Sequence, residues 1–553
     1  MNLNEIIEIS KKKSEDRLKK IRDELSIPFF KIKGQPIWNG TPKRIVVIGS
    51  GIGGMASGAL FARIGHQVSV LEMNRELIGG HGRCLTFQGL SYSMGPQYVW
   101  EFGEGKLGDR FLRYVDIKDS DPFLPMQYDG FERFFIGSRK SEGNYFTADF
   151  KVPLGLDNFR NALKDLFPEE AERLDALFDE MISIYNTYKS FFRENSATEG
   201  RFLLATKFLA TSKIPLAMKL KLGHCLTIPV KEFFDQFRIN NLLRRILYGH
   251  GGIFAENEAE MSAIAYIIGT GNYHTGAWYP EKGFAHFFDS LASVIRKNGG
   301  SVETGKKAVR LETKDNRVDG VICEDGSSYE CDFVFSDISP RLTYSLLGRQ
   351  TEAYDYTPSH SIPTCCIGIE GGLQSIADMK GRNYWWQDGN EVDYRNTDVT
   401  AAPQMLFIAS PSANGFGKAR ENPNDSLVVF CSGNYHQEKM IYEAGAQAIQ
   451  KFKTKLADDI VDILEKNVFP GIKSKLLFVE ILSSMDIEKD TGGELGNAYG
   501  RRMTVKEILK GAIDEEDCPP NLFNVSATKN SPGIASGIFT AGLLLYELTG
   551  IEI

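Results

Sequence analysis

The chain has 553 residues, of which 42% are hydrophobic and 25% are charged, and its formal net charge is −8. This composition is typical of a globular protein and excludes a wholly disordered or fibrous chain, and at about 150 residues per domain the length predicts roughly three to four structural units. The acidic balance argues against nucleic acid as the main partner.

The N-terminal segment, residues 1–42, is charged and repeats apolar residues at helical spacing, which predicts an amphipathic helical extension. It has no apolar stretch of the signal-peptide type. The eight cysteines include no C-x-x-C pair and no spacing typical of metal ligands. We therefore expect reduced thiols, no metal site and a cytoplasmic location.

A run of apolar, mostly β-branched residues at 44–48 predicts a buried parallel strand. Residues 55–64 are compatible with a helix, and residues 67–71 predict a second strand. A G-x-G-x-x-G motif connects the first strand to the helix, and its glycine-rich loop contains Gly49, Gly51, Gly53 and Gly54. This order of strand, glycines, helix and strand predicts a dinucleotide-binding unit rather than an isolated turn.

Each part of this unit has a mechanical reason. Gly49 permits the tight turn, Gly51 allows the backbone to approach a pyrophosphate, and Gly54 lets the helix pack closely on the strand. The helix N-terminus supplies N–H donors and the positive end of its dipole. Glu72, 23 residues after Gly49, is placed to accept hydrogen bonds from a ribose diol, and an acid there favours FAD or NAD over NADP.

The segment after Glu72 separates FAD from NAD. A second glycine pair and a basic residue are followed by Gly89-Leu90-Ser91-Tyr92, and a further glycine closes the segment. Here the chain resembles the flavin-dependent amine oxidase and phytoene desaturase superfamily, which implies FAD. In this resemblance the glycine pair passes over the pyrophosphate, and the basic residues assist in binding it. The FAD contacts that it implies in this segment are Glu72, Met73, Gly79, Gly80, His81, Arg83 and Gly95.

Later segments resemble the branch of that superfamily that holds retinol saturase and the carotenoid isomerases. Gly95-Pro96-Gln97-Tyr98 resembles its G-x-x-Y motif, and residues 271–283 resemble its G-x-Y-P-x-G-G motif. The segment 333–341 resembles its V-x-S-N-A motif, and Val309 stands where such proteins contact the adenine through the backbone. At the C-terminal end, the resemblance implies that the backbone of Gly533 and Ile534 caps the flavin.

The resemblance covers roughly residues 43 to 551 and implies an α/β fold. A Rossmann-type FAD-binding domain, similar to that of glutathione reductase, is built from separated pieces, and an α+β substrate domain is inserted between them. The expected segments are the helical extension 1–42, the FAD-binding segments 43–150, 281–345 and 486–553, and the substrate segments 151–280 and 346–485.

Aromatic residues gather in the segments that would surround the substrate. Four of the five tryptophans fall there, beside several tyrosines, and an aromatic tunnel would suit a long apolar chain. Each aromatic residue could equally be an ordinary core residue. We consider His274 as general acid or base, with Tyr98 and Tyr279 as further catalytic candidates. A structural role for His274 is the alternative.

Residues 201–224 combine large apolar residues with lysines and contain no acidic residue. Such a segment can lie on a membrane surface and bind anionic lipids, or it can be a core helix with its lysines directed outward. We expect no membrane-spanning helix, because the one sufficiently long apolar stretch, residues 44–65, contains the glycine motif.

The leading hypothesis is an FAD-dependent oxidoreductase that exchanges hydride between flavin N5 and a carbon–carbon double bond of a long apolar substrate. A retinoid, a carotenoid and an unsaturated fatty acyl chain all fit, and saturation, desaturation and isomerisation remain open. Amine oxidation is an alternative, although residues 524–534 lack the aromatic residue expected beside the flavin. A non-catalytic lipid carrier of the same fold is a third, and the intact glycine motif with Glu72 argues against it.

Overall fold

The computed structural model describes residues 30–32, 35–37, 42–138, 147–194, 214–349, 355–395, 397–414, 422–510, 518–529 and 532–553. Most of the expected N-terminal extension and the first part of the 201–224 segment lie outside these residues. The described residues of the extension form two short antiparallel strands rather than a helix, β1 (Phe30–Ile32) and β2 (Gln35–Ile37).

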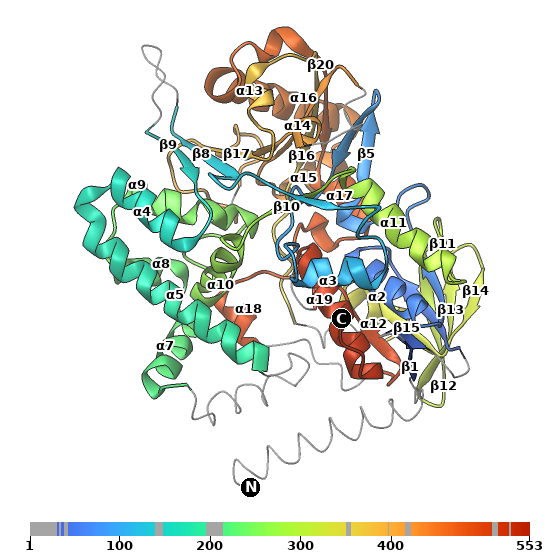
Figure 1. Ribbon diagram of the computed structural model, residues 1–553. Helices are drawn as coiled ribbons and strands as arrows, with labels where there is room; N and C mark the ends of the chain where they lie inside the picture. Colours follow the sequence, from blue (N-terminus) through green and yellow to red (C-terminus); the bar gives the residue numbers. More distant parts are fainter. Residues whose placement is uncertain are drawn as a thin grey trace.

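Five parallel strands form the first layer of the fold (Figure 1). Their order is not the order of the chain, and their residues extend from position 44 to position 524. The layer is therefore assembled from distant pieces, as the sequence predicted. The order is β11 (Ser301–Glu303), β4 (Gln67–Leu71), β3 (Arg44–Ile48), β15 (Phe333–Ser336) and β21 (Leu522–Asn524).

Both faces of this parallel sheet are buried, which explains the unbroken apolar run of β3. Ile45 and Val47 pack in the core beneath helix α2 (Ile52–Arg63), while Val46 and Ile48 pack in a second core on the opposite face. The second core contains residues of the three-stranded sheet. That sheet consists of β12 (Ala308–Lys314), β13 (Arg317–Cys323) and β14 (Ser328–Glu330). Helix α2 contacts α11 (Gly283–Lys297) and α19 (Ile534–Thr549).

A seven-stranded mixed sheet forms the second layer (Figure 1). Its order is β20 (Leu476–Leu482), β16 (Thr364–Ile369), β19 (Asp425–Phe430), β18 (Met405–Ala409), β17 (Asn383–Gln387), β8 (Glu132–Ile136) and β9 (Ala148–Val152). β8 pairs with β17 in parallel, so β8 and β9 belong to this sheet. The expected boundary at residue 150 therefore cuts through a strand of the substrate layer.

The two faces of this sheet differ in what covers them. Trp386 lies in a core cluster with Phe452 and Leu456 of α16 (Ala446–Ile463). The next residue along β17, Trp385, points to the opposite face and packs with Phe407, with ring centroids 4.7 Å apart. Alternation along the strands therefore directs one set of aromatic residues toward the interior between the layers.

Helices from residues 156 to 273 lie beside the seven-stranded sheet, on the left in Figure 1. Five apolar residues of this region stand at helical spacing in the sequence, and four of them are buried, whereas Leu166 at the end of the first helix is 46% exposed. The buried ones are Leu163, Leu174, Leu177 and Met181. Pro168 begins a short 3₁₀ turn between the first two helices, where a missing N–H costs nothing. The helices are α4 (Leu156–Leu166), α5 (Ala171–Glu194), α7 (Leu216–Thr227), α8 (Val230–Asp235), α9 (Asn241–Leu247) and α10 (Ala263–Tyr273).

Short elements connect these layers. The β-strands are β5 (Cys84–Phe87), β6 (Leu90–Ser93), β7 (Phe123–Pro125) and β10 (Trp278–Pro280). The helices are α3 (Leu107–Tyr114), α12 (Pro340–Leu346), α13 (Gln374–Ala377), α14 (Pro411–Asn414), α15 (Tyr435–Glu443), α17 (Ser484–Thr491) and α18 (Val505–Lys510).

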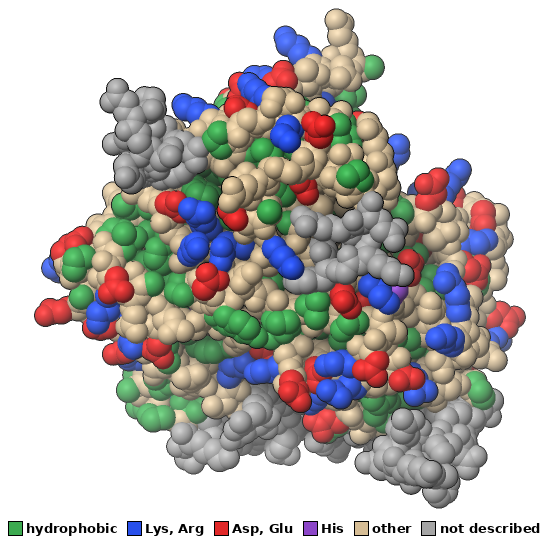
Figure 2. Space-filling model, turned by 45° about the horizontal axis from the view of Figure 1, so that its top comes forward, with side chains coloured by type: hydrophobic (Ala, Val, Ile, Leu, Met, Phe, Trp, Pro, Cys, Tyr) green, Lys and Arg blue, Asp and Glu red, His purple; other side chains and the backbone are tan. Residues whose placement is uncertain are grey.

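The surface mixes charges of both signs. Figure 2 shows acidic and basic side chains interspersed over one face, with hydrophobic side chains exposed among them. Such mixing produces no field of a single sign over that face. Within the described part of the chain, no helix is both long enough and apolar enough to cross a membrane.

Candidate functional site

A cavity of about 2300 Å³ extends from the parallel sheet to the seven-stranded sheet. At one end it is lined by residues at the carboxyl ends of β3, β4, β15 and β21, which is where ligands bind in open parallel sheets. At the other end it is lined by aromatic residues of the seven-stranded sheet and by α5, α7 and α10. The fold thus joins a nucleotide-type site to an apolar chamber.

The glycine-rich loop forms the wall at the end of β3. Gly49 has a φ of 94°, a conformation that favours glycine, so the tight-turn role expected for it fits the backbone. Gly49, Gly51 and Gly53 line the cavity, whereas Gly54 lies behind it and approaches the Gly49 carbonyl. A Cβ on Gly54 would come within 2.3 Å of that carbonyl oxygen, so close backbone packing requires glycine there.

Gly51 and Gly53 also make room for neighbouring groups that the sequence did not reveal. A Cβ on Gly51 would lie 2.5 Å from a carboxylate oxygen of Asp337, and a Cβ on Gly53 would lie 2.1 Å from the carbonyl oxygen of Val525. The contacting atoms lie at the ends of β15 and β21, the two strands on the side of β3 opposite to β4. The glycines therefore make room for neighbouring strands as well as for a ligand.

Asp337 was not among the residues that the sequence singled out. Its Oδ2 is buried and has no hydrogen-bond partner among the described residues, and the backbone N–H of Gly54 donates to its carboxyl group. Burial, together with the charge of Glu72, holds the pKa of Asp337 well above its ordinary value. Its place just after the apolar run 333–335 is the sequence signal that could have identified it.

Glu72 lies at the end of β4, only 6% exposed, and lines the cavity. Its Oε2 accepts from the backbone N–H of Ser50 at 3.0 Å, and its Oε1 accepts from that of Asn74 at 2.7 Å. The Ser50 hydroxyl also donates to Oε2 at 2.5 Å, and these bonds fix the carboxylate beside the glycine loop. Oε2 thereby accepts two hydrogen bonds, whereas Oε1 retains acceptor capacity for a ribose hydroxyl.

The second glycine pair, Gly79 and Gly80, lines the cavity next to two basic side chains. Arg83 is 3% exposed, and its guanidinium pairs with Asp490 at 3.2 Å. Its Nε is buried without a hydrogen-bond partner among the described residues, which leaves one donor for a ligand. Burial lowers the pKa of Arg83, although a guanidinium stays charged in proteins.

His81 lies close to Arg83 but is not a cation. Its Nε2 lies 2.8 Å from the Asn497 carbonyl oxygen, which only accepts, so this nitrogen carries the proton. Burial, followed by the charge of Arg83, lowers the pKa of His81 to about 4. Because its Nε2–H is committed to Asn497 and its Nδ1 only accepts, a neutral His81 has neither a charge nor a free ring N–H to offer a pyrophosphate.

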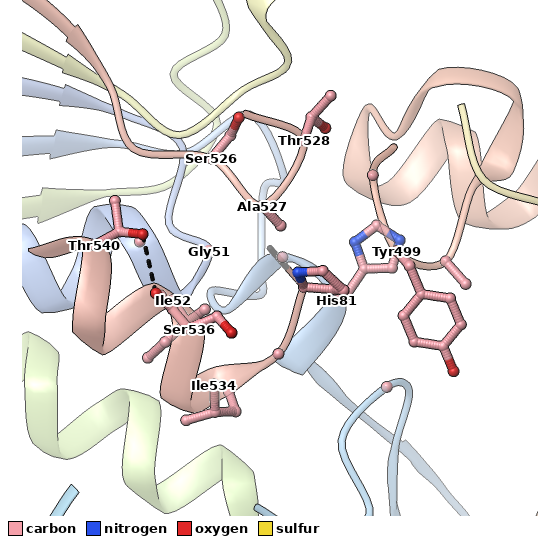
Figure 3. A pocket seen from close by; sticks show the side chains of 18 of the residues that line it. Gly51, Ile52, His81, Tyr499, Ser526, Ala527, Thr528, Ile534, Ser536 and Thr540 are labelled. Carbon is pink, nitrogen blue, oxygen red and sulfur yellow. Dashed lines mark hydrogen bonds between the residues drawn. The ribbon is translucent and has the colours of Figure 1, made fainter. Parts of the chain in front are cut away.

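The C-terminal segment closes the cavity opposite the glycine loop. Figure 3 shows Ser526 and Thr528, which follow β21, above Gly51, with Ile534 at the start of α19 below and His81 to one side. The remaining residues expected to contact the cofactor also line the cavity, and Val309 is 42% exposed at its rim. These residues are Met73, Gly95, Val309, Gly533 and Ile534.

The far end of the cavity is aromatic. Of the tryptophans expected around the substrate, Trp100 and Trp385 line the cavity, whereas Trp278 and Trp386 do not. Further aromatic lining comes from positions that the sequence did not single out. These are Phe254, Tyr394, Phe407, Phe430 and Tyr499.

The three catalytic candidates are placed differently. Tyr98 lines the cavity. His274 follows the last turn of α10 and stacks on Phe159 with ring centroids 4.9 Å apart, away from the lining residues, and burial lowers its pKa to about 3. Tyr279 lies in β10 against Phe284, also outside the lining. Tyr98 is therefore the candidate that can meet a ligand in the cavity.

Helix α7 is the described part of the 201–224 segment. Lys219, Leu222 and Leu226 line the cavity, whereas Leu216 and Leu220, on another face of the helix, are 71% and 65% exposed. The helix thus presents apolar side chains both to the chamber and to the outside. A core helix would bury the outward leucines.

Comparison with known proteins places the chain among flavoproteins. A family model described as flavin containing amine oxidoreductase matches residues 52–341. The 1-hydroxycarotenoid 3,4-desaturase of Flavobacterium sp. is 23% identical over 83% of this chain and 88% of its own length. The all-trans-retinol 13,14-reductase of Danio rerio is 24% identical over 82% of this chain and 77% of its own length.

A solved structure confirms the fold class. Cyclohexylamine oxidase from Brevibacterium oxydans superimposes with a TM-score of 0.56, at 14% sequence identity, over 92% of this chain and all of its own. At that identity the likeness concerns the fold alone. The predicted Rossmann-type fold and the predicted superfamily are both confirmed.

Proposed function

We propose that this chain, which belongs to the flavin-containing amine oxidoreductase family and uses FAD, exchanges hydride with carbon–carbon double bonds of a long apolar polyene. A retinoid, a carotenoid or an unsaturated fatty acyl chain is the class of substrate. Saturation, desaturation and isomerisation are the three outcomes that such an exchange can have.

The residues at the parallel-sheet end of the cavity fit FAD. Glu72 holds spare acceptor capacity for a ribose diol, and the N-terminus of α2 supplies backbone donors for a pyrophosphate. The partnerless Nε of buried Arg83 adds a charged donor on the same side. We assign the adenine contact to Val309 and the flavin-end contact to the backbone of Gly533 and Ile534.

FAD supplies the hydride chemistry when bound, accepting or donating two electrons with one proton. The chain's own contribution is to hold an apolar substrate against that cofactor and to exclude water. Aromatic side chains such as Trp385, Phe407 and Phe430 offer a surface that stabilises a polyene by apolar burial, at about 25 cal/mol per Å².

The observation that carries the proposal is the size of this aromatic cavity. Its volume of about 2300 Å³ is more than twice the roughly 1,000 Å³ of a large small-molecule site, so it can hold FAD and a long second molecule together. The names of two relatives, a carotenoid desaturase and a retinol reductase, support a polyene as that second molecule.

The exposed leucines of α7 support an entry route from a lipid surface. Leu216 and Leu220 could insert among lipid tails while Leu222 and Leu226 of the same helix face the chamber. A polyene would then pass from the bilayer to the cavity along one helix. We extend the proposal to peripheral contact with membranes through this helix.

Two other functions receive less support. For amine oxidation, the segment 524–534, whose described residues line the cavity, contains no aromatic residue to form a cage at the flavin. A non-catalytic lipid carrier has no need of Glu72 and the glycine motif.

The test begins with the purified protein and its visible spectrum. We expect flavin bands near about 370 and 450 nm. The reduced enzyme is then incubated without oxygen with retinol, a carotene or an unsaturated fatty acid, and the oxidised enzyme likewise. A product heavier by two mass units indicates saturation, a lighter one desaturation, and an isomer of equal mass isomerisation. Unchanged polyenes together with turnover of an amine would overturn the proposal.

A further inference from the structure

A buried carboxyl group lies directly behind the aromatic wall of the cavity. Glu132, the first residue of β8, is fully buried and pairs in register with Asn383 of β17. The hydroxyl of Tyr273 donates to its Oε2 at 2.5 Å. The side chains of Tyr98 and Trp385 also lie close enough to the carboxyl group to affect its pKa, although the Trp385 Nε1 has no hydrogen-bond partner among the described residues. Glu132 is therefore surrounded by two phenols and an indole.

Two of these three neighbours connect Glu132 to the cavity. Tyr98 and Trp385 line it, whereas Tyr273 lies behind Tyr98, with ring centroids 6.3 Å apart. An indole N–H does not release its proton in such a role, but a phenol both gives and accepts one. Tyr98 is consequently the group through which a proton of Glu132 can reach the chamber.

The surroundings of Glu132 favour its neutral form. Burial raises its pKa to about 7, against the smaller opposing effects of the nearby Tyr273, Trp385 and Tyr98 side chains. Tyr499, on the loop that follows α17, is a further titratable group near the carboxylate: burial and then the charge of Glu132 raise the pKa of Tyr499. Glu132 thus exchanges its proton near neutral pH, as a proton relay requires.

We infer that Tyr98 is the group that passes a proton to or from the substrate carbon, and that Glu132 is a positioning residue that resupplies or takes up that proton. The inference rests on the proposed function. It assigns the proton transfer that must accompany hydride transfer when a double bond is reduced or formed.

In reduction, hydride from the reduced flavin forms a C–H bond at one carbon of the double bond. The π electron pair of that bond then forms a second C–H bond at the other carbon with the proton of Tyr98. The Tyr98 O–H bond breaks, Glu132 returns a proton to the phenolate, and water reprotonates the carboxylate. In desaturation, oxidised flavin accepts the hydride and the same proton path runs outward from carbon to Tyr98 to Glu132.

The test compares Glu132→Gln and Tyr98→Phe with two matched controls. Glu438→Gln alters another fully buried carboxyl group whose pKa is about 7, hydrogen-bonded by Ser484 outside the cavity lining. Tyr266→Phe removes a buried phenol that donates to the Leu247 carbonyl, also outside the lining. Both controls should keep the wild-type rate and pH profile.

We expect Tyr98→Phe to slow turnover at saturating substrate by roughly 100-fold or more, while the dissociation constant of the polyene changes little. In reduction the wild-type rate should fall as pH rises through about 7, and in desaturation it should rise. Glu132→Gln should be slow and lose this dependence. The infrared band of a protonated carboxyl group should weaken between pH 6 and pH 8 in wild type and less so in Glu132→Gln.

The outcomes separate the inference from the proposed function. Wild-type protein that carries FAD and converts no polyene overturns the proposed function and this inference with it. Active wild-type enzyme with an unchanged pH profile in Glu132→Gln, or with full turnover in Tyr98→Phe, overturns the inference alone. An infrared band unaltered by Glu132→Gln would also refute it, whatever the activity.

Discussion

Gly53→Ala is the single-methyl change that the structure should tolerate least in the dinucleotide-binding helix. The added Cβ would lie 2.1 Å from the Val525 carbonyl oxygen and 2.8 Å from an Asp337 oxygen. An ordinary C···O contact is about 3.3 Å, so the backbone at Val525 must move by roughly 1 Å. Such overpacking costs about 1–3 kcal/mol, whereas alanine in a helix gains up to about 1 kcal/mol over glycine. We therefore expect a net loss of about 1–2 kcal/mol.

The assay is calorimetric unfolding of the FAD-free protein. Calorimetry is chosen because a chain with several cores need not unfold in one step. Only the transition of the FAD-binding layer should shift. Gly223→Ala is the matched control. Gly223 lies inside helix α7, and nothing lies within 4 Å of the position of its added Cβ. This variant should be more stable than wild type by up to about 1 kcal/mol. The reasoning is refuted if Gly53→Ala is as stable as wild type.

Four further predictions concern other residues. Gly51→Ala should lower flavin occupancy because its added Cβ meets an Asp337 oxygen at 2.5 Å, so adding Asp337→Ala to that variant should restore the occupancy. If it does not, Gly51 is needed only for the approach to the pyrophosphate. Glu72→Gln should keep the circular dichroism of wild type and retain less FAD after gel filtration, and equal retention would count against the ribose assignment. Leu220→Asp should weaken binding to anionic vesicles, whereas Met440→Asp, at a comparably exposed site on α15, should not. The folded-state pKa of Glu438 is raised from 4.5 to about 7, so its protonation contributes stability that is lost as pH rises through that window, and the thermal midpoint of Glu438→Gln should fall less over it.

The cofactor end of the site could be predicted from sequence because its signals are local. The strand, the glycines, the helix and Glu72 follow one another within 30 residues, and the role of each can be read from its neighbours in the sequence. The role of Gly51 could not be completed in this way. The side chain that fills the space beside it, Asp337, belongs to a strand far along the chain.

The substrate end depended on pairings that no local pattern encodes. Glu132 reaches the cavity wall because β8 pairs with β17, which places it beside Asn383 and near Trp385. His274 illustrates the reverse case. Its motif placed it near the chamber, but it caps the buried helix α10 and its ring stacks on Phe159, a contact with a residue more than 100 positions earlier that no local pattern encodes.

The strand order of the parallel sheet has a consequence for synthesis. β3 and α2 leave the ribosome long before β21 and α19, which complete the sheet and pack on α2. At about 5–20 residues per second, some tens of seconds separate the two. During that interval α11 is made and can pack on α2, but the part of α2 that packs against α19 stays uncovered, and the wall opposite the glycine loop does not exist. A nascent chain therefore cannot complete its flavin site until β21 and α19 have been made, which places cofactor binding after the synthesis of both cores.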